Sequence, residues 1–191
     1  PVTRLKLQLA LMPPSEEIEA AKRDLGDMEQ TLEEYLTFAK GLGEEAPETV
    51  DVGVLATEVV ADSTRGGADI AVEQSGQVAA PARSRALKRC LVNLVDNAAA
   101  HGDKVRVIVK GEENAVTVSV DDNGPGIPEE LFEEAFRPFS RLDATRSRNQ
   151  KGVGLGLAIA RDVARSHGGD IFLSQSPLGG LRAMLRLPRP A

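Results

Sequence analysis

The chain has 191 residues, a net charge of −6 and one cysteine, Cys90. This length suffices for one domain with a hydrophobic core, with or without an appendage. The acidic balance and the lack of a basic run argue against a nucleic-acid-binding protein, and the single cysteine argues against a disulfide framework. No apolar run approaches the roughly 20 residues of a membrane span. We interpret Cys90, which lies in an apolar helical stretch, as a buried hydrophobic residue.

Residues 1–43 are predicted to form an antiparallel helical hairpin. Apolar residues at alternating spacings of three and four over 18–39 are typical of the seam of a helical bundle. Residues 2–12 repeat the spacing more briefly, and 13–15 (Pro-Pro-Ser) end one helix and cap the next. A second copy of the chain would bury this seam in a four-helix bundle; the alternative is a hairpin folded onto the following domain.

Residues 47–191 are predicted to form an α+β domain. We expect helices at 52–61, 81–100 and 155–166, and strands at 70–73, 105–109, 116–120, 171–174 and 183–187. Helices on one face of a mixed sheet make an α/β sandwich. The stretch 129–152 fits neither period and carries basic residues before a glycine, so we interpret it as a mobile lid over phosphates.

Three motifs in this domain suit different parts of ATP. They are Asn93 to Asn97, Asp122 to Gly126 and Gly152 to Leu157. The Asp122 carboxylate can accept a hydrogen bond from an adenine amino group. The Asn97 carboxamide oxygen suits Mg²⁺, which takes hard oxygen ligands while it bridges phosphates. The glycine run opens an apolar helix, whose N–H groups and positive dipole end can face a phosphate.

These motifs, with Phe136-Arg-Pro-Phe139, resemble the N, G1, F and G2 boxes of bacterial two-component sensor histidine kinases, in particular those of the osmosensor type. The resemblance covers nearly the whole chain. It implies a Bergerat (GHKL) fold for 47–191 and a dimerisation and histidine-phosphotransfer hairpin at 1–43. The first five residues look like the end of the acceptor-histidine motif, and neither His101 nor His167 has that motif around it. We therefore expect a piece of a longer protein that lacks the acceptor histidine.

The resemblance also implies residue roles. Asn97 becomes the magnesium ligand, Asn93 a catalytic polar residue near the phosphates and Asp122 the adenine-reading carboxylate. Arg146 and Lys151 become the lid cations that neutralise the γ-phosphate, and which of them does so stays open. The implied nucleotide contacts are Asn93, Asn97, His101, Asp122, Gly124, Gly126, Ile127, Phe139, Lys151, Gly152, Val153, Gly154, Leu155, Gly156 and Leu157.

Several of these positions keep an alternative. Asn93 either contacts the phosphates or bonds within its helix, and Phe139 either contacts nucleotide or packs in the core. His101 stands where an aromatic residue is common in the family, and it either stacks on the base or closes a helix end. Ala100 stands where many relatives carry Lys or Arg, so phosphate binding either weakens or depends more on the lid.

The function that the resemblance implies is transfer of the γ-phosphate of Mg-ATP to a hairpin histidine, and then to an aspartate of a response-regulator receiver domain. The expected partners are ATP or ADP, a second copy of the chain and the receiver domain. The chain would be the cytoplasmic portion of a bacterial inner-membrane sensor, attached to the membrane only through other parts of that protein. Two alternatives stay open: a non-catalytic nucleotide-binding dimerisation module, and another Bergerat-fold ATPase.

Overall fold

The computed structural model describes residues 8–9, 11–13, 15, 18–22, 25–26, 45–63, 69–140 and 154–189. The chain divides into two compact units, 1–43 and 44–191, and each is described by itself. In the first unit, the Ser15 hydroxyl accepts a hydrogen bond of 3.2 Å from the Ile18 N–H, where helical residues 18–22 begin. Most of the predicted hairpin lies outside the described residues, so the hairpin stays a prediction.

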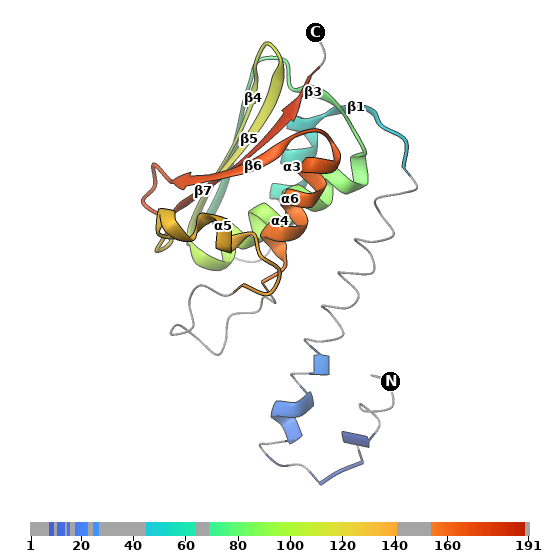
Figure 1. Ribbon diagram of the computed structural model, residues 1–191, viewed down its shortest axis with the longest axis vertical. Helices are drawn as coiled ribbons and strands as arrows, with labels where there is room; N and C mark the ends of the chain where they lie inside the picture. Colours follow the sequence, from blue (N-terminus) through green and yellow to red (C-terminus); the bar gives the residue numbers. More distant parts are fainter. Residues whose placement is uncertain are drawn as a thin grey trace. The chain divides into compact units, whose positions relative to one another are not determined.

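The second unit is built on a five-stranded sheet with the order β2-β4-β5-β7-β6 (Figure 1). Strand β2 is parallel to β4, and the other neighbours are antiparallel. A separate antiparallel pair joins β1 to β3. The bounds are β1 Glu48–Asp51, β2 Asp69–Ser75, β3 Ala79–Ala82, β4 Lys104–Gly111, β5 Ala115–Asp122, β6 Asp170–Gln175 and β7 Leu181–Pro188.

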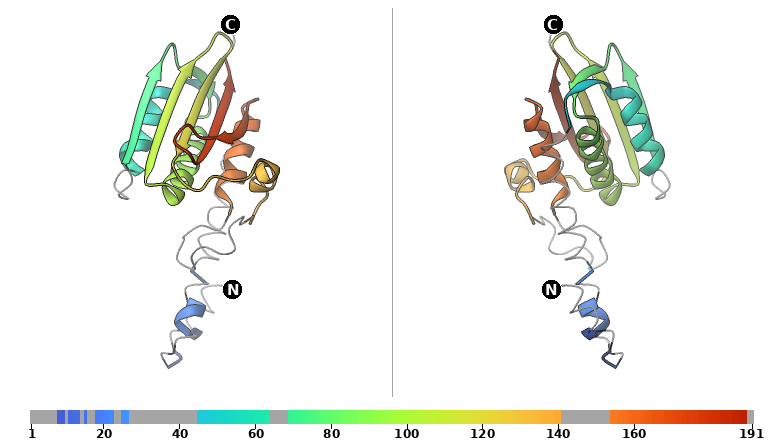
Figure 2. Two further views of the ribbon diagram at one scale, coloured as in Figure 1. Left: turned by 90° about the vertical axis from the view of Figure 1, so that its left-hand side faces the viewer. Right: turned by 90° about the vertical axis from the view of Figure 1, so that its right-hand side faces the viewer.

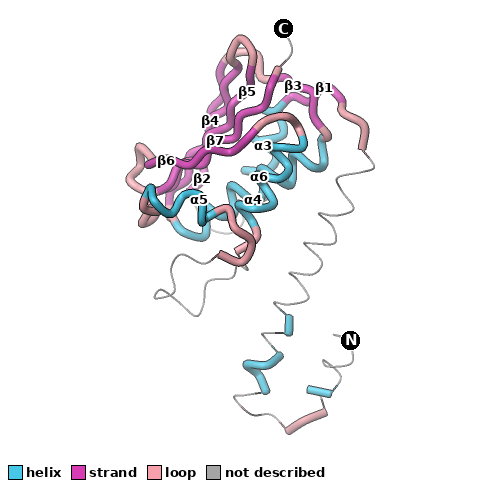
Figure 3. Tube along the Cα trace, in the orientation of Figure 1, coloured by secondary structure: helices cyan, strands magenta, loops and turns pink. Residues whose placement is uncertain are grey.

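Three helices cover one face of the sheet, as the two side views in Figure 2 show. They are α3 (Val52–Ser63), α4 (Ser84–His101) and α6 (Gly156–Ser166). The short helices η2 (Glu129–Leu131) and α5 (Phe132–Ala135) precede α6 in the chain. Helices and strands therefore form two layers, which Figure 3 separates by colour. The predicted α+β sandwich is confirmed.

Alternating valines fix which face of the sheet meets the helices. Val105, Val107 and Val109 of β4 are buried, as are Val118 and Val120 of β5. Because side chains alternate across a strand, each set lies on one face of the sheet. Full burial of one such side chain contributes about 1.5–3 kcal/mol, so these rows provide much of the free energy that holds the two layers together.

Helices α4 and α6 pack against each other at Cys90. The Cys90 thiol is fully buried and donates a hydrogen bond to the Ala160 carbonyl, with a sulfur–oxygen distance of 3.4 Å. Burial raises the pKa of this thiol to about 12, so it stays protonated near neutral pH. The interpretation of Cys90 as a buried hydrophobic residue is confirmed.

The predicted helix start at Pro81 is wrong. Pro81 pairs with Thr49 in the small β1–β3 sheet, and α4 begins at Ser84 after Arg83 in an extended conformation. Proline is acceptable in a two-stranded edge pair, where its missing N–H need not bond. The first part of the stretch 129–152, which was predicted to be a lid without helical or strand periodicity, contains the short helices η2 and α5. Residues 141–153 lie outside the described residues, so the lid stays a prediction.

Candidate functional site

Asp122 lies at the end of β5 and is only 3% exposed. Its Oδ1 accepts hydrogen bonds from the Gly124 N–H at 2.8 Å and from the Leu181 N–H at 3.1 Å. In the described part of the chain no group donates to Oδ2. A buried carboxylate is costly unless it is hydrogen-bonded, and these two backbone donors compensate for part of its lost hydration. The second oxygen remains an acceptor for a ligand.

The loop after Asp122 approaches the end of α4 closely. A Cβ on Gly124 would lie 2.5 Å from the His101 carbonyl oxygen and 3.0 Å from Asp122 Oδ1, so only glycine fits. Gly126 has a φ of 70°, which also favours glycine. Ile127 follows, half-buried. A steric reason at Gly124 and a conformational reason at Gly126 thus explain both glycines, in addition to the predicted ligand contacts.

Asn93 and Asn97 lie one helical turn apart on α4, so their side chains share a side of the helix. The Asn93 Nδ2 is buried and has no partner among the described residues. An unsatisfied buried donor costs about 1–3 kcal/mol, so this one calls for an acceptor from a ligand. Asn97 is half-buried.

The N-terminus of α6 lies beside Asn93. A Cβ on Gly156 would lie 3.8 Å from the Asn93 carbonyl oxygen and 4.0 Å from Asn93 Oδ1. The first N–H groups of a helix have no partner within the helix and carry the positive end of its dipole. Orphan donors from α6 and from Asn93 therefore lie close together, which suits a polyphosphate.

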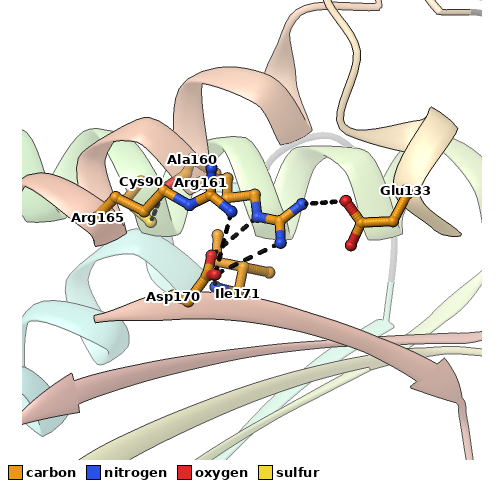
Figure 4. A network of polar contacts seen from close by, with 7 residues as sticks. All are labelled: Cys90, Glu133, Ala160, Arg161, Arg165, Asp170 and Ile171. Atoms are coloured by element: carbon orange, nitrogen blue, oxygen red, sulfur yellow. Dashed lines mark hydrogen bonds and ion pairs between the residues drawn. The ribbon is translucent and has the colours of Figure 1, made fainter. Parts of the chain in front are cut away.

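Arg161 of α6 forms ion pairs with Glu133 of α5 and with Asp170 of β6 (Figure 4). Its guanidinium lies 4.2 Å from the Phe136 ring centroid and donates to Glu133 Oε2 and Asp170 Oδ1, each at 2.9 Å. The hydrogen bond to Asp170 raises the pKa of Arg161. Burial opposes ionisation of Asp170, but hydrogen bonds, chiefly from Arg161, hold its pKa below the usual value.

Phe139 is held in an unusual backbone conformation. Its φ is 65°, and it is the one positive-φ residue other than glycine in the described ranges. The Phe139 N–H donates to the Gly154 carbonyl at 2.9 Å. The chain positions on either side of segment 141–153 are therefore joined. Phe139 is 63% exposed, so the alternative that it packs in the core is wrong.

His101 and His167 have different surroundings. His101 is exposed and ends α4, next to the Gly102 N–H that donates to the Ala98 carbonyl at 2.8 Å. His167 Nε2 accepts from the Arg83 N–H at 3.0 Å, so Nδ1 carries the proton and donates to the Val163 carbonyl at 2.7 Å. His167 thus caps α4 from the end of α6.

The structure describes most of the predicted nucleotide contacts. Leu155 and Leu157 are buried in the core, so only their backbone is available to a ligand. Four predicted residues lie outside the described ranges: Arg146, Lys151, Gly152 and Val153. The sequence analysis did not single out Arg161 as a residue that organises this part of the domain. The only signal in the sequence for its pairing with Asp170 is that the two side chains carry opposite charges.

In the described ranges, no three His, Cys, Asp or Glu side chains gather into a group that could hold a metal ion. None of the helices in those ranges is both long and apolar enough to span a membrane.

A two-layer sandwich with these asparagines, carboxylate and glycines defines an ATP-binding domain of the GHKL type. Residues 82–191 match the model of the histidine kinase-, DNA gyrase B- and HSP90-like ATPases, and the chain belongs to this family.

Known relatives narrow the class. The chain is 39% identical to the sensor histidine kinase GtrS of Pseudomonas aeruginosa over 192 residues, which cover 99% of this chain and 39% of GtrS. The ATP-binding domain of PrrB from Mycobacterium tuberculosis is 29% identical with a TM-score of 0.65, covering 77% of this chain and 100% of that one. The histidine kinase domain of the E. coli osmosensor EnvZ is 33% identical with a TM-score of 0.59, and the match covers 78% of this chain and 93% of that one.

These likenesses establish a histidine-kinase-type ATP-binding catalytic domain of the kind found in sensor kinases. Neither alternative, a non-catalytic module or another Bergerat-fold ATPase, is better supported. The chain spans 39% to 44% of the length of the first curated relatives that it matches.

Proposed function

We propose that this domain binds Mg-ATP with the adenine amino group on Asp122 Oδ2. The observation that carries the proposal is a buried carboxylate with one oxygen held by two backbone N–H groups and the other without a donor in the described ranges. An ionised carboxylate only accepts hydrogen bonds, so the base must present a donor. Adenine does so through its amino group.

The phosphates would lie between α4 and the N-terminus of α6. The buried Asn93 Nδ2 and the approach of Gly156 to Asn93 suit an anionic ligand. The Asn97 carboxamide oxygen would hold Mg²⁺, with water and phosphate as the other ligands. When bound, this ion neutralises charge on the phosphates. Arg146 and Lys151 would add positive charge at the γ-phosphate.

In the full-length protein the domain would transfer the γ-phosphate to a histidine on the N-terminal hairpin. A response-regulator receiver domain would then accept the phosphoryl group on aspartate. The names of the sensor kinases that this chain resembles support the assignment, as do the four motifs in order. The hairpin at 1–43 would make the protein a homodimer, and other parts of the protein would attach it to the membrane.

Phosphotransfer is tested by supplying the acceptor separately. The chain contains only two histidines, and neither has the acceptor motif around it. With radiolabelled γ-phosphate, the chain alone should gain no acid-labile, base-stable label, whereas a separate hairpin with the full motif should be labelled in trans. The Asn97→Ala variant should abolish that label, and Asn114→Ala, on an exposed turn, should not. An unlabelled hairpin beside a chain that binds ATP would contradict the kinase proposal.

A further inference from the structure

The turn between β6 and β7 comprises residues 176–181, of which Leu181 is also the first residue of β7, and it reaches the carboxylate assigned to adenine. Strand β7 pairs with β5 so that Arg182 lies opposite Asp121, which brings the preceding residues of the turn against Asp122. The Leu181 N–H donates to Asp122 Oδ1 at 3.1 Å, and the Gly180 N–H donates to the Asp122 carbonyl at 3.1 Å. The turn therefore contacts both the side chain and the backbone of Asp122.

Gly180 is packed too tightly to carry a side chain. A Cβ there would collide with Asp122 Oδ1, and it would also lie 2.5 Å from the Gly124 nitrogen and 2.8 Å from the Asp122 carbonyl oxygen. Two of these atoms are backbone. The third belongs to a short side chain that two hydrogen bonds already fix, so none of the three can move away without disturbing the carboxylate.

The neighbouring glycine is present for a different reason. Gly179 has a φ of 105°, and a Cβ there would meet nothing within 4 Å. Its requirement is backbone conformation alone. The turn is also held internally, because the Ser176 N–H donates to the Gly180 carbonyl at 2.9 Å and the buried Ser176 hydroxyl accepts from the Leu178 N–H at 3.0 Å. A turn fixed in this way can act as a support.

We propose that the β6–β7 turn is a positioning element of the nucleotide site, and that Gly180 sets the preference for the adenine amino group. The turn brings the Leu181 N–H to Oδ1, which together with Gly124 fixes the carboxylate rotamer and leaves Oδ2 for the base. Gly180 touches no reacting atom; it acts through Asp122. The inference rests on the proposed function, because it assumes that Asp122 reads adenine.

The test compares two nucleotides by calorimetric titration in the presence of Mg²⁺: ATP, and purine riboside triphosphate, which lacks the amino group. In the wild-type chain ATP should bind on the order of tenfold or more tightly than the analogue, since a hydrogen bond to a charged acceptor is lost. Asp122→Ala should remove that preference. A wild-type chain with no preference would overturn the adenine assignment itself, whatever the role of the turn.

Gly180→Ala should reduce the preference for ATP to less than about threefold while the variant remains folded by circular dichroism, because the displaced carboxylate no longer meets the amino group. Gly179→Ala is the matched control. It should lower the melting temperature through backbone strain and keep the wild-type preference. A folded Gly180→Ala variant with the wild-type preference would overturn the proposal.

A second measurement does not depend on the folding of Gly180→Ala. Hydrogen exchange of the Leu181 amide should accelerate at least tenfold in Asp122→Ala, because its acceptor is gone, whereas the Leu185 amide further along β7 should exchange at the wild-type rate. Unchanged exchange at Leu181 would show that turn and carboxylate are not coupled, and the proposal would be wrong.

Discussion

Arg161 connects α6 to two other elements through one side chain, which is 14% exposed. It donates to Asp170 at the start of β6 and to Glu133 of α5, and it lies over the Phe136 ring. The contact with Glu133 is on the surface, because that side chain is 82% exposed, so the pair adds little. The half-buried ion pair with Asp170 and the packing of the guanidinium on the Phe136 ring contribute more to the stability of the domain.

Replacing Arg161 by alanine should lower the free energy of unfolding by about 2 kcal/mol, because a hydrogen-bonded charge pair is broken. Arg165→Ala is the control: Arg165 also donates to Asp170, at 3.3 Å, but is 54% exposed and should cost less than about 1 kcal/mol. Urea denaturation measures both variants. Equal losses would mean that exposure does not decide the strength of these pairs.

The loss of stability in Arg161→Ala should depend on pH. The pKa of Asp170 is lowered in the folded chain, so its stabilising contribution is present above the unfolded pKa of about 3.9 and is lost as the pH falls toward the folded value. Arg161→Ala should therefore differ from the wild type less at strongly acidic pH than at pH 7. A stability difference between wild type and Arg161→Ala that stays constant from strongly acidic pH to pH 7 would contradict the role assigned to the Arg161–Asp170 pair.

Asp122 could be singled out from the sequence, but its surroundings could not. A carboxylate followed by two nearby glycines suggests a ligand site, and Gly124 and Gly126 each have a steric or conformational reason in the structure. The Leu181 N–H that fixes the carboxylate comes from 59 positions further along the chain. Only the pairing of β7 with β5 brings it there, and no local pattern encodes that pairing.

At the scale of elements, periodicity predicted what is long and regular. The alternating valines indicated β4 and β5, and the apolar face of 81–100 indicated α4. The short strands β1 and β3 were missed because each has four residues and gains its partner from across the chain. Pro81 was consequently assigned to a helix start, a role that proline also favours.

The predicted helical seam gives the test of assembly. Leu25 is helical and 7% exposed. It is one of the apolar residues that recur every three or four positions over 18–39, which places it at an inner position of the proposed bundle. Leu25→Lys should dissociate the dimer, because a charge would have to be buried. Leu11→Lys is the control, since Leu11 is 82% exposed. Light scattering at several concentrations measures the mass. A wild-type chain that stays monomeric at high concentration would contradict the dimer proposal.

At the scale of the whole molecule, residues 44–191 form a compact unit whose fold positions the groups that we propose to bind nucleotide. The sheet supplies Asp122, α4 supplies Asn93 and Asn97, and α6 supplies backbone N–H groups. The residue types in the three motifs were enough to predict that a carboxylate, carboxamides and backbone N–H groups would be offered to a nucleotide. It could not predict the unsatisfied Asn93 Nδ2 or the contact of Gly124 with the His101 carbonyl, because both depend on packing between elements.

Calorimetric titration of Mg-ATP into the wild-type chain and four variants tests the central claim most directly. Asp122→Ala and Asn97→Ala should each lose about 1.5–3 kcal/mol of binding free energy, because a charge-assisted hydrogen bond or a metal ligand is removed. Asp103→Ala and Asn114→Ala, both at exposed positions, should bind as the wild type does. Wild-type affinity in both Asp122→Ala and Asn97→Ala would contradict the nucleotide site proposed for this domain.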